Sequence, residues 1–218
     1  MRKLIAVLAL AVAAVSVAAV TTSGAGANDK VLAHFNLVPA NAKILPCLAK
    51  YPNDPSRPPK AEVTVVKGNL NDRLVMRVSN IKPGLQFDLF TVQRSPLLAN
   101  GAPDPAFPKT FGMAWYQSDV EAGSSGEGSV AVQTVLLDQI FGFDADTGLA
   151  PTNTFHLGFW FNNPQDAAQC GFDVTHPTPF NGEHRAGPLA MISLPDAQTR
   201  LGPLCINPDA SQLSGCNP

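Results

Sequence analysis

The sequence predicts an all-β protein, an antiparallel β-sandwich of about seven to eight strands. Short segments alternate between apolar and polar residues with the period of two that is typical of half-buried strands. Twenty prolines and seventeen glycines among 218 residues separate these segments with turns. No amphipathic helix of useful length follows residue 27, which excludes a helical bundle.

The predicted strands begin at Val31, where apolar and polar residues alternate through 31–38. Segments 62–67 and 73–79 flank a turn-rich connection and are expected to form a β-hairpin. Pro83 and Gly84 favour a type II turn, because glycine tolerates the positive φ that this turn requires. The other strands are expected at 85–93, 111–120, 128–137, 154–162 and 189–194.

Three segments between or after these strands are expected to be irregular. Segment 95–109 holds four prolines and is predicted to be a loop. Segment 138–153 is a longer loop, and 136–143 has the composition for one short turn of helix. Segment 163–218 is rich in proline, and we expect it to pack on the sandwich as an irregular extension.

The first 27 residues have the pattern of a secretory signal peptide. Arg2 and Lys3 precede an almost wholly apolar run, and Ala25-Gly26-Ala27 is a small-residue cleavage site. The alternative interpretation is an N-terminal membrane anchor, since the apolar run nearly reaches the length that spans a bilayer. Cleavage near Ala27 would leave residues 28–218 as a single secreted domain with no membrane span.

All four cysteines lie in this exported part of the chain: Cys47, Cys170, Cys205 and Cys216. An even number of cysteines in an oxidising compartment predicts two disulfides. Four cysteines allow three pairings. We favour Cys47–Cys170 together with Cys205–Cys216, which would close a small C-terminal loop. A zinc site is less favoured, because no C-x-x-C pair is present.

The run from Val63 to Val92 resembles secreted immunoglobulin-like and fibronectin type III-like modules. Its hairpin is followed by Ser79-Asn80-Ile81-Lys82-Pro83-Gly84 and then by Phe87-Asp88-Leu89-Phe90. A similar order of strand, Pro-Gly turn and strand occurs in copper/zinc superoxide dismutase-like sandwiches, but the H-x-H pair of their copper site is missing here. The whole chain also resembles exported β-proteins of high-GC bacteria. These resemblances imply a β-sandwich and carry over no functional residue.

Aromatic residues on one predicted strand suggest a ligand surface. In 154–162, His156 and Trp160 fall on the phase opposite the apolar residues of the strand. Trp160 beside Gly158 would present an open face that could stack on a sugar, and Trp115 on another strand could extend this platform. The alternative is that the segment after Asn163 covers Trp160, which would then belong to a second, smaller core.

A carboxylate-rich loop suggests weak calcium binding. Asp144 and Asp146, followed by Gly148, resemble the opening of an oxygen-ligand calcium loop, and Asp138 is a third potential ligand. The bidentate Glu of a complete EF-hand is missing, because Phe155 stands at its position. The alternative is that these residues only form turns. The sequence implies no other cofactor.

Histidines and charges complete the candidate features. His34 and His156 are expected on the outward face of their strands, where they could meet, and His176 and His184 lie in the irregular extension. Residues 110–184 contain nine acids and no Lys or Arg, whereas 28–109 carry a net charge of +5. We expect either pairing between these two regions or an acidic face that attracts cations.

These features together favour a secreted, non-catalytic protein that binds a ligand or has a structural role in the cell envelope. The formal charge of −2 excludes a generally basic nucleic-acid binder. The sequence does not identify the partner, and a glycan or cell-wall polymer is one candidate. The alternatives are a carbohydrate-binding module using Trp160 and Trp115, or a hydrolase whose site is assembled from loops, since no G-x-S-x-G or H-E-x-x-H motif is present.

Overall fold

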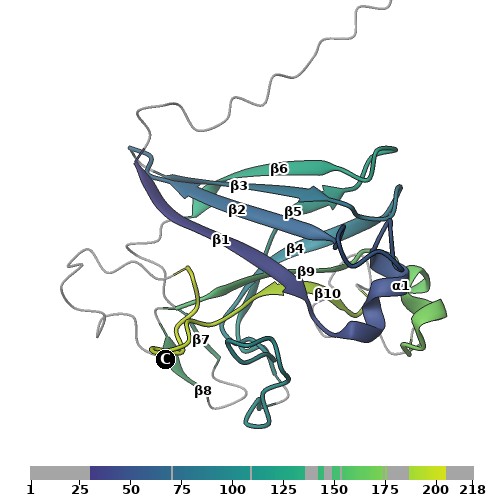
Figure 1. The fold of residues 1–218 in the computed structure, drawn as a ribbon. Coiled ribbons are helices and arrows are strands. Elements are labelled where there is room, and N and C mark those ends of the chain that lie inside the picture. Colours follow the sequence, from purple (N-terminus) through teal and green to yellow (C-terminus); the bar gives the residue numbers. More distant parts are fainter. Residues whose placement is uncertain are drawn as a thin grey trace, which may run out of the picture.

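A computed structural model describes residues 30–69, 71–108, 110–135, 142–144, 149–152, 154–173, 175 and 187–204. Strands dominate these residues (Figure 1). The strands are β1 (Val31–Pro39), β2 (Lys60–Val66), β3 (Asp72–Ser79), β4 (Gln86–Val92), β5 (Ala114–Glu121), β6 (Gly128–Val135), β7 (Gly142–Asp144), β8 (Leu149–Thr152), β9 (His156–Phe161) and β10 (Leu189–Ser193). The helical elements are η1 (Ala42–Ile44), α1 (Leu45–Leu48) and η3 (Pro164–Cys170).

Eight strands form one antiparallel sheet in the order β5-β4-β9-β10-β1-β2-β3-β6, while β7 and β8 pair separately. The sheet curls until its two edge strands, β5 and β6, come close together, so that it is nearly closed (Figure 1). The predicted antiparallel β architecture is therefore confirmed. A two-layered sandwich and an immunoglobulin-like arrangement are not confirmed, because the eight strands belong to a single continuous sheet.

The predicted β2–β3 hairpin is confirmed, with a register that runs from Lys60↔Ser79 to Val66↔Arg73. Beside its turn, the Lys67 ammonium lies 3.6 Å from the carboxylate of Asp72, whose side chain is fully buried. An ion pair at this position offsets part of the cost of burying the Asp72 charge. This pair joins two residues of the basic region 28–109, rather than the basic and acidic regions.

The main core fills the inside of the curled sheet. On β4 and β9, alternate residues point inward, and the Phe87 ring lies 4.7 Å from that of Phe159 and 5.3 Å from that of Phe161. Burying each such side chain contributes about 1.5–3 kcal/mol. Further strand residues of this core are Val63, Val65, Leu74, Met76, Leu89, Leu157, Ala190 and Met191.

A second core lies on the outer face of β4, β9 and β10. Phe90, Trp160 and Ile192 from these strands pack there with Leu97, and Phe111 packs against the cluster. Leu97 and Phe111 belong to the connection between β4 and β5, so this loop folds back over the sheet. Strand β9 is therefore buried on both faces, and all six of its residues are buried.

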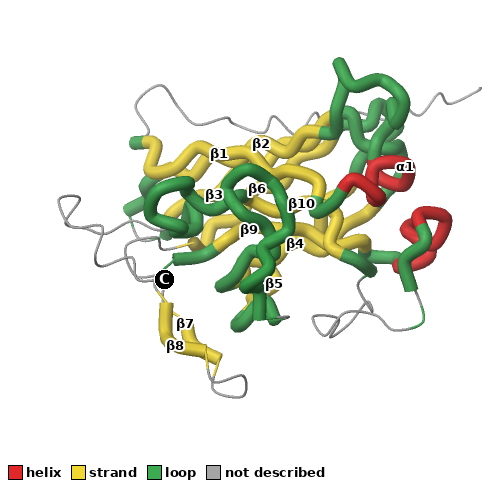
Figure 2. Tube along the Cα trace, turned by 60° about the horizontal axis from the view of Figure 1, so that its bottom comes forward, coloured by secondary structure: helices red, strands yellow, loops and turns green. Residues whose placement is uncertain are grey.

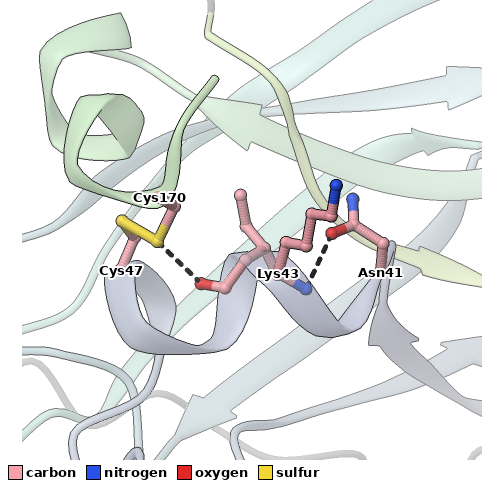
Figure 3. Close-up of a disulfide and its surroundings, with 5 residues drawn as sticks. Asn41, Lys43, Cys47 and Cys170 are labelled. Atoms are coloured by element: carbon pink, nitrogen blue, oxygen red, sulfur yellow. Dashed lines mark hydrogen bonds between the residues drawn. A yellow bond between two sulfur atoms is a disulfide. The ribbon is translucent and has the colours of Figure 1, made fainter.

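Short helices at one end of the sheet are joined by a disulfide. Cys47 on α1 is bonded to Cys170 at the end of η3, with 6.1 Å between their Cα atoms, which confirms the predicted pairing (Figure 3). The Asn41 side chain accepts a hydrogen bond from the Lys43 N–H beside it and so caps η1 (Figure 3). Cys205 and Cys216 lie outside the described residues, as does the candidate signal peptide.

The region between β6 and β9 differs from its expected form where the structure describes it. Gly142 and Phe143, which were expected at the end of a helical turn, belong to strand β7, and β7 pairs with β8 within the expected loop. The rest of the expected helical turn, 136–141, lies outside the described residues. A three-residue strand paired with a four-residue strand is too short to produce a clear alternation pattern.

Candidate functional site

The two tryptophans proposed as a sugar-binding platform lie on opposite faces of the sheet. Trp160 is fully buried in the second core, with its ring 5.4 Å from Phe90 and 5.3 Å from Phe111. Trp115 packs against the main core, and its ring lies 5.2 Å from that of Phe155. These two rings therefore do not form a common exposed surface. Trp160 thus belongs to a second, smaller core, as the alternative interpretation expected. The segment after Asn163 contributes Leu189, Ile192 and Leu194 to this core, and the β4–β5 connection adds Leu97 and Phe111.

His156 begins β9 at the same end of the sheet where β4 and β10 finish. It lies opposite Val92 at the end of β4, and its Nδ1 is 3.2 Å from both the carbonyl oxygen and the hydroxyl of Ser193 at the end of β10. A carbonyl oxygen only accepts hydrogen bonds, so Nδ1 carries the proton in this arrangement. Nε2 is then an acceptor, and it has no hydrogen-bond partner within the described part of the chain.

Burial determines the protonation state of His156, which is 4% exposed. Desolvation lowers the pKa of the imidazole to about 4, and the positive charge of Arg94 acts in the same direction. The hydrogen bond to Ser193 acts in the opposite direction and is outweighed. The imidazole is therefore neutral at neutral pH. His34, by contrast, is exposed and lies 3.1 Å from the Thr64 hydroxyl, so the two histidines do not meet.

A cleft of about 610 Å³ opens above His156. One wall is the start of the β4–β5 connection and the other is the segment after β10. Both lie at the lower end of the sheet in Figure 1, and Figure 2 brings this end forward, with the connections drawn as green loops. The cleft is lined by Gln93, Arg94, Ser95, Leu97, Leu98, Ala99, Asn100, Asp104, Ala106, Thr154, His156, Pro195, Asp196, Ala197, Thr199 and Arg200.

Two arginines bring positive charge to this cleft. Arg94 is the second residue after β4, and its backbone N–H donates to the Phe111 carbonyl at 3.0 Å. Its side chain is half-buried, and its Nε is buried without a hydrogen-bond partner among the described residues. Arg200 is exposed on the opposite wall and has a positive φ of 60°. Neither guanidinium forms an ion pair with an acid that the structure describes.

Asp104 and Asp196, two acids that line the cleft, accept hydrogen bonds from backbone N–H groups of the cleft walls. The Asp196 carboxylate accepts hydrogen bonds from the Thr199 and Gln198 N–H groups and from the Thr199 hydroxyl, which together lower its pKa. Asp104 uses one carboxylate oxygen to accept from the Ala106 N–H at 2.8 Å. Both acids thus fix turns and keep at least part of their acceptor capacity for other donors.

Hydrolysis would need a nucleophile within reach of His156. Ser193 touches its Nδ1, but Ser193 is fully buried and its Oγ accepts from the Leu157 N–H at 3.1 Å. Ser95 is directed to the Ser193 carbonyl, 3.4 Å away. A base with a pKa of about 4 is also weak at neutral pH. The described geometry thus brings no activated hydroxyl to the free nitrogen of His156.

The calcium prediction falls mainly outside the described residues. Asp138 and Asp146 are not described, and of Asp144 only the backbone, in β7, is described. His176 and His184 also lie outside. Within the described ranges, no three His, Cys, Asp or Glu side chains are grouped as metal ligands. In the same ranges no helix is both long and apolar enough to cross a membrane.

Sequence reasoning found one member of the cleft, His156, and missed its partners. Arg94 and Ser95 begin a proline-rich connection, and Arg200 lies in a segment expected to be irregular. The chain order gives no signal that these segments meet, because β4, β9 and β10 are neighbours in the sheet but far apart in sequence.

Comparisons with protein-family models, curated proteins and solved structures find no match.

Proposed function

We propose that this chain is an exported protein that binds a small ligand in the cleft above His156. Two residues that line the cleft have a nitrogen with no hydrogen-bond partner among the described residues: His156, whose Nε2 is an acceptor, and Arg94, whose Nε is a buried donor. Buried polar atoms normally have partners, so the buried Nε of Arg94 points to a ligand or ordered water beside it. The cleft volume is also in the range of small-molecule sites.

Binding is favoured over hydrolysis by the state of His156. A neutral imidazole held by Ser193 is well suited to accept one hydrogen bond in a fixed direction. It is poorly suited to proton transfer near neutral pH, because its pKa of about 4 lies far below the operating pH. The function proposed here is therefore recognition, and the proposed cellular site is outside the membrane after cleavage near Ala27.

The proposal is tested by thermal melting of residues 28–218 with a screening set of D-galactose, D-galacturonate, L-glutamate, citrate and phosphate at millimolar concentration. At least one compound is expected to raise the melting temperature, because a ligand that binds only the folded state stabilises it by mass action. Ala197→Trp places a large side chain in the cleft and should abolish the shift. Ala168→Trp adds the same ring to an exposed position on η3 and should not.

An equal shift in both tryptophan variants would place binding elsewhere on the molecule and overturn the proposal. No shift with any compound in the wild-type protein would count against small-ligand binding of these classes.

For export, the full-length chain is produced in a bacterium and its secreted or periplasmic form analysed by mass spectrometry. A mature chain beginning at Asn28 is expected, whereas an intact cell-retained chain would contradict cleavage.

A further inference from the structure

We infer that the ligand of this cleft is a sugar acid, whose carboxylate contacts Arg94 and whose hydroxyls donate to His156 Nε2 and Asp104. This inference rests on the proposed function and names the chemical class that the same cleft selects. It follows from three properties of the lining within the described part of the chain: guanidinium groups without an acidic partner, acceptors without donors, and the scarcity of aromatic rings.

The guanidinium groups of the cleft favour an anionic ligand. Arg94 is half-buried with a buried Nε, and no described acid forms an ion pair with it or with Arg200. Removing a guanidinium from water without a partner is costly. A carboxylate is the planar anion whose two oxygens match the parallel N–H groups of arginine, and such charge-assisted pairs are among the strongest hydrogen bonds.

The hydrogen-bond acceptors of the cleft favour a ligand that also carries hydroxyl donors. Nε2 of His156 is unprotonated because the single N–H of the neutral imidazole is at Nδ1, where it donates a hydrogen bond to the Ser193 carbonyl. The second carboxylate oxygen of Asp104 has no hydrogen bond to a described residue, since only the first accepts from Ala106. A bare anion such as acetate satisfies the arginine but leaves both acceptors unused, whereas a polyhydroxylated acid satisfies both.

The apolar part of the lining argues against a neutral sugar. Leucine, alanine and proline side chains such as Leu97, Ala106 and Pro195 supply this part, and His156 is the only aromatic residue among the described residues that line the cleft. Neutral sugars are commonly held by stacking on an indole or phenol ring, and Trp160 is buried beneath the loop instead. Affinity must therefore come from charge and directed hydrogen bonds.

The test is calorimetric titration at neutral pH of the mature chain with D-galacturonate, D-galactose and acetate. D-galacturonate is expected to bind at least about tenfold more tightly than D-galactose, which lacks the carboxylate, or acetate, which lacks the hydroxyls. Arg94→Gln should weaken D-galacturonate binding by about tenfold or more, and Arg94→Lys should weaken it less. Arg77→Gln removes the same charge from an exposed position on β3 and should leave affinity unchanged.

Equal binding of D-galacturonate and D-galactose, or an Arg94→Gln variant with unchanged affinity, would overturn the inference. Each variant is first melted without ligand, and Arg94→Lys, which retains the charge, provides the comparison if Arg94→Gln folds poorly. If L-glutamate binds and Ala197→Trp blocks it while D-galacturonate does not bind, the cleft remains the binding site and only the sugar-acid class is wrong. If Ala197→Trp blocks nothing, the proposed function itself fails.

Discussion

At the scale of single residues, a buried polar cluster joins three strand ends under the cleft. The Ser193 carbonyl lies within hydrogen-bond distance of both His156 Nδ1, at 3.2 Å, and the Ser95 hydroxyl, at 3.4 Å. The Ser193 hydroxyl in turn accepts from the Leu157 N–H. Because β4, β9 and β10 end or begin here, this cluster fixes the position of the imidazole relative to Arg94. A histidine in a fixed position is what a directional ligand contact requires.

This cluster predicts an acid-sensitive fold. In the folded protein the pKa of His156 is about 4, against an ordinary value of 6.5, so between these values the unfolded chain binds a proton that the folded protein does not. The free energy of unfolding should therefore have its highest value above pH 6.5. It should decrease as the pH is lowered to about 4, by at most about 3 kcal/mol. Urea unfolding at intervals across this range measures the loss.

A matched pair of variants isolates His156 in this experiment. His156→Asn keeps a donor for the Ser193 carbonyl and removes the titrating group, so its stability should depend much less on pH between 6.5 and 4. His34→Asn changes an exposed histidine and should retain the wild-type profile. Asp54 and Asp196, whose pKa values are lowered by hydrogen bonds, lose their contribution only at more acidic pH. An unchanged profile in His156→Asn would contradict the argument.

At the scale of elements, the β5–β6 turn brings the two edges of the sheet together. Its Gly126 carbonyl accepts from the Ile81 N–H at 3.1 Å, and the Ser125 carbonyl accepts from the Lys50 ammonium. The turn is therefore anchored to the segment before β4 and to the chain after α1. Gly126 has a φ of +78°, and a Cβ atom there would lie 2.4 Å from the Ile81 carbonyl oxygen.

Two glycine variants separate backbone strain from this close approach. Gly84 has a φ of +82° with nothing within 4 Å of an added Cβ, so Gly84→Ala should cost about 1–2 kcal/mol of stability, the cost of a positive φ alone. Gly126→Ala carries the same strain plus the contact with Ile81 and should cost about 1–3 kcal/mol more. Urea midpoints compare them. Equal losses would show that the turn moves freely away from Ile81.

The strand-level predictions were more successful than those about loops, for physical reasons. In segments 62–67 and 73–79, apolar and polar residues alternate, because one face of each strand packs on the core and the other does not. The hairpin predicted from this pattern is confirmed. Strand β9 was located from the same pattern, yet its two faces are equally buried. Its outward face is covered by Leu97 and Phe111, whose proline-rich loop has no period that reveals where it packs. Exposure of Trp160 was thus not predictable from β9 alone.

At the scale of the whole molecule, the neighbours in the sheet come from distant parts of the chain. The β10 strand, which matches the strand predicted at 189–194 within the proline-rich extension, lies between β9 and β1 and so joins the two halves of the sheet. Such non-local pairing is not encoded in local patterns, which is why strands were predicted but their single nearly closed sheet was not. The cleft depends on the same pairing, since its walls follow β4 and β10.

The Cys47–Cys170 disulfide also acts at this scale, because it closes a loop with a sequence separation of 123. In the chain-entropy model a loop of this length stabilises the fold by about 5 kcal/mol, and measured losses are commonly about 2–5 kcal/mol. Cys47→Ala/Cys170→Ala should lower the urea midpoint accordingly. Reduction of the wild-type protein should give a similar or larger loss. A double variant as stable as the oxidised protein would contradict this role.

The central claim is that the cleft above His156 is where this protein recognises its ligand. The most direct test is an amide chemical-shift map of ¹⁵N-labelled residues 28–218 with each compound of the screening set. We predict shifts confined to the cleft walls, 93–106 and 195–200, and to residues around His156, with the β2–β3 hairpin unaffected. Shifts centred on another surface, or none with any compound, would contradict the claim.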